Sequence, residues 1–189
     1  MTPMPCPAET VATDAGMLAL WDPESFTDVV DHDTWNLRLG ADEDVRRHIR
    51  AGSLVPINIR NDGAFAVLVR FGCPERPAQL TERERAHGLL SSDAYLFSSS
   101  GRVWLSGIEA VGAQAWPEIV QFELPAGRYS VVIHLIAWED EVCGVNDDGT
   151  PSATALPDFV VLVAPAGPGQ DVFRTDVETF DPPETTRPG

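Results

Sequence analysis

The sequence predicts a mainly all-β protein, an antiparallel two-sheet β-sandwich with two short helical connections. Two observations carry this prediction. Short apolar runs are separated by turn residues, and no stretch alternates strand, helix and strand in the way a parallel sheet requires. The expected strands are residues 17–21, 54–60, 64–71, 94–99, 102–107, 118–124, 128–138 and 158–164.

Three pairs of these runs are joined by residues that favour tight turns, which predicts three antiparallel hairpins. Residues 54–60 and 64–71 flank Asn61-Asp62-Gly63, residues 94–99 and 102–107 flank Ser-Ser-Gly, and residues 118–124 and 128–138 flank Pro125-Ala126-Gly127. The run 128–138 is apolar on both faces, which is typical of a central strand. Pro56 marks the run 54–60 as an edge strand, or its start as a bulge.

Two segments carry helix signals. Residues 41–52 begin with three acids and end with bases and Gly52, a polarity that suits the helix dipole and a glycine cap. Residues 81–88 contain the capping-box pattern Thr81-x-x-Glu84. Neither segment has a wide apolar stripe, so we expect both to be connections that lie over the sandwich.

The length of 189 residues suits one domain, which we expect to span residues 17–164. Residues 1–16 are rich in Pro, Thr and Ala and are expected to be flexible, and residues 165–189 form a Pro/Gly-rich acidic tail. The N-terminus has no basic region followed by an apolar run, which favours a cytoplasmic protein. Three widely spaced cysteines fit a reducing compartment.

The negative charge is confined to the flanks. The formal net charge is −16, and residues 1–37 and 129–173 each hold seven acids and no base, whereas residues 38–128 are neutral overall. Such a field repels nucleic acid and anionic membranes and attracts basic proteins. We therefore expect no nucleic-acid or membrane partner.

No cofactor or metal site is expected. The stretch "GVNDDG" would place Gly144 and Ala155 at the first and twelfth positions of an EF-hand loop, where carboxylate ligands are needed. The histidines form no closely spaced pair, and on a strand Asp31 and Asp33 would point away from His32. Cys143 follows three acids, which would raise the pKa of its thiol and oppose a nucleophilic role.

The stretch 134–150 is the main candidate site, because it follows the expected central strand and concentrates acidic residues. An acidic loop can mimic a phosphate backbone and can be steered onto a basic cleft. The candidate partner-binding residues are Glu139, Asp140, Glu141, Asp147 and Asp148.

The C-terminal half also resembles a known family. The sequence "FELPAGRYSVVIHLIAW", followed by an acidic loop and "LPDFVVLVAP", resembles the bacterial competence-type nuclease inhibitors of the competence J family. The matching residues are Leu124, Pro125, Gly127 and Tyr129, and then the strand 158–163. The resemblance covers about a quarter of the chain, and residues 1–90 have no counterpart in it. It implies an acidic cytoplasmic β-sandwich that caps a basic protein.

Two functions follow. The first is a non-enzymatic acidic binding module, an inhibitor or immunity protein that caps a basic, nuclease-like partner. The alternative is a carbohydrate-active or carbohydrate-binding sandwich that uses clustered carboxylates and some of the five tryptophans. The position of His134 discriminates between them, because a cleft that held His134 beside Asp140 or Asp158 would favour an enzyme.

Overall fold

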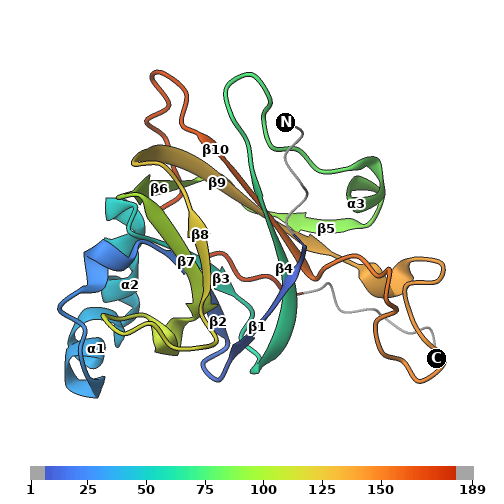
Figure 1. The fold of residues 1–189 in the computed structure, drawn as a ribbon, viewed down its shortest axis with the longest axis horizontal. Coiled ribbons are helices and arrows are strands. Elements are labelled where there is room, and N and C mark those ends of the chain that lie inside the picture. The colour runs from blue at the N-terminus through green and yellow to red at the C-terminus, as the bar shows by residue number, and fades with distance from the viewer. Residues whose placement is uncertain (1–6, 182–189) are drawn as a thin grey trace.

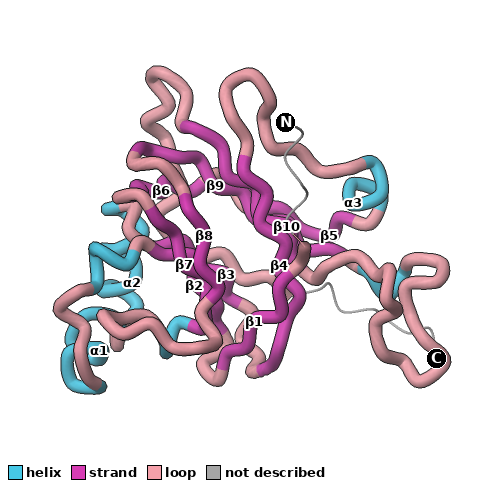
Figure 2. The backbone as a smooth tube through the Cα atoms, viewed as in Figure 1, coloured by secondary structure: helices cyan, strands magenta, loops and turns pink. Residues whose placement is uncertain are grey.

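The computed structural model describes residues 7–181 and confirms a mainly-β fold in two sheets (Figure 1). Figure 2 shows that strands make up the body and that helices lie at its margins. Sheet A contains β1 (Glu9–Thr13), β4 (Gly63–Phe71), β10 (Phe159–Pro165) and β9 (Gly127–Ile136), with β5 (Gly88–Ser91) and β6 (Tyr95–Ser99) both paired to β9. Sheet B contains β3 (Leu54–Asn58), β2 (Met17–Trp21), β7 (Arg102–Gly107) and β8 (Val120–Glu123).

One strand pair departs from the antiparallel arrangement, since β10 and β4 run parallel, with Val161 opposite Val69. Strand β10 pairs antiparallel with β9 on its other side, with Val161 opposite Ile133. A long stretch of chain separates β4 from β10, so no tight turn fixes their relative direction. Sheet A is therefore mixed.

The three predicted hairpins do not form, although each turn lies where it was expected. Strand β3 belongs to sheet B and β4 to sheet A, and the same separation holds for β6 and β7 and for β8 and β9. Each short connection therefore crosses from one sheet to the other. Turn residues specify only that the chain reverses, whereas pairing depends on the distant strands that complete each sheet.

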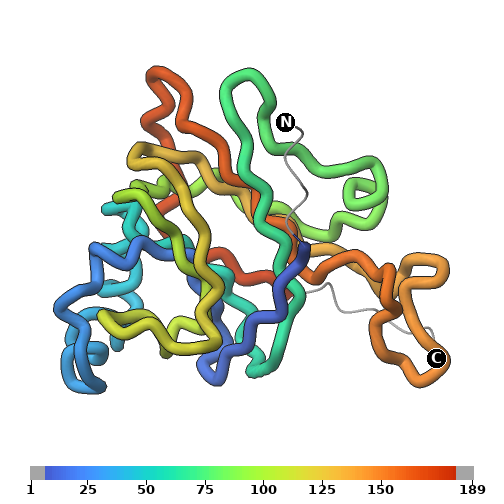
Figure 3. The backbone as a smooth tube through the Cα atoms, in the orientation of Figure 1, coloured from blue at the N-terminus to red at the C-terminus, as the bar shows by residue number. Residues whose placement is uncertain are grey.

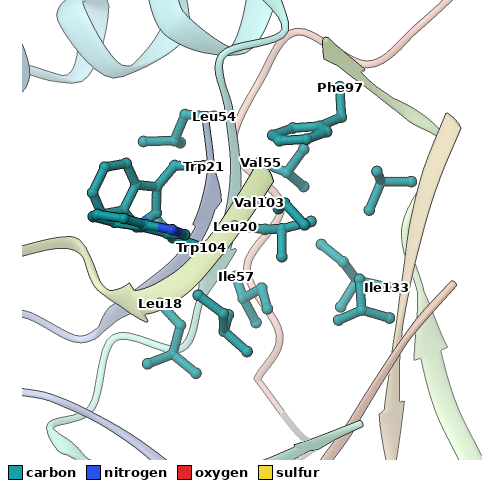
Figure 4. Packing of buried hydrophobic residues seen from close by; sticks show 14 of the residues in the cluster. Leu18, Leu20, Trp21, Leu54, Val55, Ile57, Phe97, Val103, Trp104 and Ile133 are labelled. Atoms are coloured by element: carbon teal, nitrogen blue, oxygen red, sulfur yellow. The ribbon is translucent and has the colours of Figure 1, made fainter. Parts of the chain in front are cut away.

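The core fills the space between the sheets. Figure 4 shows Leu20, Val55 and Val103 of sheet B on the side that faces Ile133 of sheet A. All four residues are fully buried. On the other side of sheet B, the ring of Trp21 lies edge-on to Trp104, with ring centroids 5.1 Å apart. Sheet B is thus apolar on both faces, because the helical segment 23–51 lies beyond it (Figure 1).

Two features of individual strands agree with the sequence. Strand β9 lies inside sheet A, and β3, which contains Pro56, is an edge strand of sheet B that pairs with β2 and forms one isolated bridge, from Asn58 to Thr179. The hydroxyl of Tyr129 donates a hydrogen bond to the carbonyl of Pro125 at 2.8 Å and ties the start of β9 to the preceding turn. This contact gives a structural reason for the Leu-Pro-x-Gly-x-Tyr spacing, since it fixes the corner at which the chain changes sheets.

Both predicted helices are present. Helix α2 (Asp42–Ala51) ends at Gly52, whose left-handed backbone has a φ of 74°. Helix α3 (Glu82–Ala86) begins with the expected capping box between Thr81 and Glu84. Short 3-10 turns follow β2, β7 and β9: η1 (Pro23–Phe26), η2 (Ile108–Ala110) and η3 (Trp138–Asp140).

A further helix, α1 (His32–Leu39), contains His32 and Asp33, for which a strand was the expectation. The Asp31 carboxylate caps this helix by accepting a hydrogen bond from the Thr34 amide at 2.8 Å. The sequence signal for this helix is a capping box of the form Asp-x-x-Thr, a variant of the more common Ser/Thr-x-x-Glu pattern.

Both segments that flank the expected domain 17–164 contribute to the fold. Residues 9–13 of the N-terminal segment, expected to be flexible, form β1 and pair with β4. In the tail, Phe180 is 1% exposed and lies edge-on to Phe159. Val11 at the N-terminus and Phe180 in the tail explain the difference, because each supplies apolar surface to bury. Residues 1–6 and 182–189 of these two segments lie outside the described residues.

Candidate functional site

The acidic loop comprises residues 137–158 and connects β9 to β10. It extends away from the body of the sandwich, as the orange segment at the lower right of Figure 3 shows. Its base is fixed by Asp158, whose carboxylate accepts hydrogen bonds from the indole of Trp138 at 2.8 Å and from the amide of Ala66 at 2.7 Å. Leu156 packs in a small apolar cluster with Ile136 and Val160. The loop therefore leaves the sheet at a defined place.

Glu141 forms an ion pair within the protein. Both of its carboxylate oxygens accept hydrogen bonds from the guanidinium of Arg83 in α3, and the Arg83 Nη2 to Glu141 Oε2 distance is 2.6 Å. The Arg83 guanidinium also holds the pKa of Glu141 below its usual value. The Glu141 side chain is only 12% exposed. Of the five predicted binding residues, this one is best explained as a tie between the loop and α3.

The second half of the loop is a hydrogen-bonded turn. The carboxylate of Asp148 accepts from the amide and hydroxyl of Thr150, at 3.0 and 2.6 Å, and these bonds lower the pKa of Asp148. The amide of Gly149 donates to the carbonyl of Asn146, and Gly149 has a φ of 84°. Such contacts account for the Asn, Asp and Gly composition without a metal.

Three of the predicted residues remain free of such contacts: Glu139, Asp140 and Asp147. All three are exposed, and their carboxylates take part in none of the ion pairs or side-chain hydrogen bonds found between residues 7 and 181. Val142, which lies between the two groups of acids in sequence, is 90% exposed. The exposed part of the loop thus combines unpaired negative charge with an apolar side chain.

His134 is not a base in a carboxylate cleft. It is half-buried in β9, opposite Val160 of β10 and Ser91 of β5. Burial lowers the pKa of His134, and the nearby Glu84 partly opposes this shift. The Glu84 carboxylate is itself bound by Arg70 at 2.8 Å, and Asp158 is occupied as described above. Among residues 7–181, no hydrogen bond joins His134 to Asp140 or to Asp158.

Other chemistry is also unsupported among the residues that the structure describes. No group of three or more His, Cys, Asp or Glu side chains converges there in a way that could hold a metal ion. Cys143 is exposed and has a left-handed backbone with a φ of 71°. No helix between residues 7 and 181 is long and apolar enough to cross a membrane.

The five tryptophans fall into three environments. Trp21 and Trp104 are buried in the core, and Trp138 packs in the small cluster beside the acidic loop. Trp35 and Trp116 line the same cavity. Sequence spacing could not associate these last two, because 80 residues separate them and a fold is needed to bring them together.

This cavity, the α1 pocket, has a volume of about 300 Å³ and lies between α1 and the segment 109–116. Two hydrogen bonds fix its walls: the indole of Trp35 donates to the carbonyl of Ile108 at 3.0 Å, and the amide of Ala113 donates to the carbonyl of Val29 at 2.8 Å. Gly112 permits this approach, since a side-chain carbon there would lie 2.8 Å from the Val29 carbonyl oxygen. The pocket is thus held in shape by the protein.

Comparison with known proteins relates the fold to two solved structures. One is the product of crocagin biosynthetic gene J, with a TM-score of 0.57 and 15% identity, covering 85% of this chain and 97% of that one. The other is ComJ from Bacillus subtilis, an inhibitor of the DNA-degrading activity of NucA, with a TM-score of 0.51 and 11% identity, covering 86% of this chain and 97% of ComJ. No known family model matches the chain, and no curated protein does.

These two structures confirm the resemblance to the competence J family at the level of fold. The resemblance was drawn from about a quarter of the sequence, whereas the common fold with ComJ covers 86% of the chain. At this low identity the likeness concerns the arrangement of the chain and assigns no activity to it.

Proposed function

We propose that this protein is a binding module that captures a basic protein partner, with nuclease inhibition as the leading activity. The observation that carries the proposal is the set of unpaired, exposed acids on the acidic loop, Glu139, Asp140 and Asp147. Charges left without a partner in the free protein are available to an incoming one. Their field would steer association with a basic surface and would weaken with added salt.

Two further observations support a protein as the partner. Val142 and Val145 are exposed on the same loop, and an apolar contact surrounded by polar groups is typical of protein interfaces. The fold is also that of ComJ, which inhibits the DNA-degrading activity of NucA. The bonds from Arg83 and Trp138 hold the loop in place, which reduces the entropy lost on binding.

The test is capture of a partner from a lysate of the source cells, followed by measurement of DNA degradation by the captured protein. We expect the wild-type chain to retain a basic protein and to lower its nuclease activity. The variant E139K/D140K/D147K should lose this capture at low salt, because three attractive contacts become repulsive.

A matched variant controls for the change in net charge. Asp62, Glu75 and Glu118 are exposed and lie outside the acidic loop, so D62K/E75K/E118K alters the total charge by the same amount. It should retain the partner. Equal binding by both variants would show that the loop is not the interface, and equal loss would show that only total charge matters.

The carbohydrate alternative keeps one specific observation in its favour. Trp35 and Trp116 share the α1 pocket with two carboxylates, those of Asp31 and Glu109. Aromatic rings are common platforms for sugar rings, so oligosaccharide binding by this pocket is the second candidate function. Titration with a disaccharide such as cellobiose, followed by tryptophan fluorescence, tests it directly.

A further inference from the structure

We infer that the α1 pocket is a binding site for an organic cation, such as the guanidinium group of an arginine. Helix α1, which lines the pocket, lies at the end of the molecule opposite the acidic loop (Figure 1). The pocket is therefore a second site, and it does not depend on the function proposed for the loop. Three properties of its lining support the inference: aromatic walls, uncompensated carboxylates and the lack of a competing cation.

The aromatic walls come from two different parts of the fold. Trp35 projects from α1 and is fixed by its bond to the Ile108 carbonyl, whereas Trp116 lies on the segment before β8 and is 50% exposed. An exposed tryptophan at the mouth of a formed pocket leaves an indole face available to a ligand. Tryptophan is the side chain that attracts cations most strongly through its ring face.

The carboxylates of Asp31 and Glu109 supply the charge. Glu109 accepts hydrogen bonds from the Thr13 hydroxyl at 3.0 Å and the Asp14 amide at 2.9 Å, and Asp31 accepts from Thr34. These donors are neutral groups, so they bring no positive charge to either carboxylate. Neither carboxylate takes part in any ion pair formed within residues 7–181.

Among residues 7–181, no arginine lines the pocket, and Arg38 at the end of α1 is paired with Asp28. Two carboxylates and no arginine therefore line the pocket, and a positively charged ligand would enter without displacing an arginine of the described residues.

The same features disfavour other ligands. The start of α1 offers no anion site, because the Asp31 carboxylate already caps it. The floor of the pocket includes the buried side chains of Val29 and Val111, which suit an apolar stem. A volume of about 300 Å³ is at the lower end for ligand pockets, so it fits one side chain or a small amine better than a long oligosaccharide.

The test is titration of the full chain with N-acetyl-arginine amide, followed by tryptophan fluorescence and calorimetry at low salt. We expect saturable binding that is weakened by salt. The neutral analogue N-acetyl-citrulline amide should bind at least tenfold more weakly, since it has nearly the same shape and lacks the charge. Equal binding of the two, tighter binding of cellobiose, or no binding of the arginine probe would each overturn the inference.

Substitutions of lining residues test whether the ligand binds in the α1 pocket. W116A should weaken binding of the arginine probe by on the order of fivefold. D31N, which removes the charge and keeps a good helix cap, should also weaken it. E123Q, an exposed acid of β8 outside the pocket, should leave it unchanged. Equal affinities for W116A, D31N and the wild type would show that the cation binds elsewhere.

A comparison of two ligands distinguishes the possible sources of the cation. A further variant distinguishes the pocket inference from the loop proposal. Tighter binding of a Gly-Gly-Arg-Gly-Gly peptide than of agmatine would indicate the side chain of a protein, whereas the reverse would indicate a free small molecule. The loop variant E139K/D140K/D147K should bind the arginine probe like the wild type. Failure of the pocket inference and failure of the loop proposal therefore appear in different assays.

Discussion

Residues 1–37 and 129–173 have the same acidic composition, seven acids and no base each, but the structure distributes the unpaired acids differently. In the first flank Asp31 caps α1 and Asp28 pairs with Arg38, whereas the unpaired acids are spread over β1, the following turn and α1. In the second, Glu139, Asp140 and Asp147 remain exposed and unpaired by any group of residues 7–181. Composition locates negative charge, whereas the surroundings of each carboxylate decide whether it stabilises the fold or is available for binding.

The largest expected effect on stability comes from Asp22, a structural acid of the first flank that is 4% exposed. Its carboxylate accepts hydrogen bonds from the hydroxyls of Ser100 at 2.5 Å and Ser25 at 3.0 Å. D22A removes these acceptors and should lower the free energy of unfolding by about 2 kcal/mol. Urea denaturation measures this change, and a value below about 0.5 kcal/mol would contradict a structural role.

Substitution of Arg83 tests the ion pair that this residue forms with Glu141, an acid of the second flank. Because the pKa of Glu141 lies below its ordinary value of 4.5, the ion pair stabilises the fold above that pH, and its contribution is lost as the pH falls. R83M should therefore raise the pKa of Glu141, as measured by NMR titration. The variant should also have a lower urea midpoint than the wild type at pH 7, with the difference shrinking toward pH 3. An unshifted Glu141 would show that the ion pair does not persist in solution.

Two substitutions of Asp31 distinguish the two roles of its carboxylate, which caps α1 and brings negative charge to the α1 pocket. D31A should lower the urea midpoint, since it leaves the amide of Thr34 without its acceptor, whereas D31N should change it little. Both substitutions should weaken binding of the arginine probe. If D31N is as unstable as D31A, the negative charge rather than the cap stabilises α1.

The smallest effect on stability is expected from the unpaired acids of the loop. The variant E139A/D140A/D147A removes three exposed side chains that have no partner in the fold, so its free energy of unfolding should change by less than about 0.5 kcal/mol. An increase in stability would also be informative, because it would show that these acids repel one another. A loss of about 2 kcal/mol would mean that they support the loop and are not free to bind.

The sequence predicted well the features that depend on local residues. It located every described strand except β1 and β5, together with the capping box of Thr81 and Glu84, the cap at Gly52 and the edge strand with Pro56, because each follows from neighbouring residues. It failed where the outcome depends on distant contacts. The three turns join different sheets, and β10 lies parallel to β4, because pairing is decided by strands far apart in the chain.

The same distinction applies to the sites. The acidic loop is one continuous stretch, so its acids could be found from the sequence, but the ion pair of Glu141 with Arg83 could not, since it joins the loop to α3. The α1 pocket was missed because Trp35 and Trp116 come together only through the fold. The sequence also does not show which tryptophans are buried and which are exposed, because the exposure of each ring depends on its contacts in the fold.

The most direct test of the central claim is an assay of plasmid DNA degradation by the nuclease partner captured from the source cells. With increasing amounts of the wild-type chain we expect the rate of degradation to fall. The control D62K/E75K/E118K should inhibit to the same extent, whereas E139K/D140K/D147K should not inhibit. Full inhibition by the loop variant would contradict the claim that the unpaired acids of the loop form the binding surface.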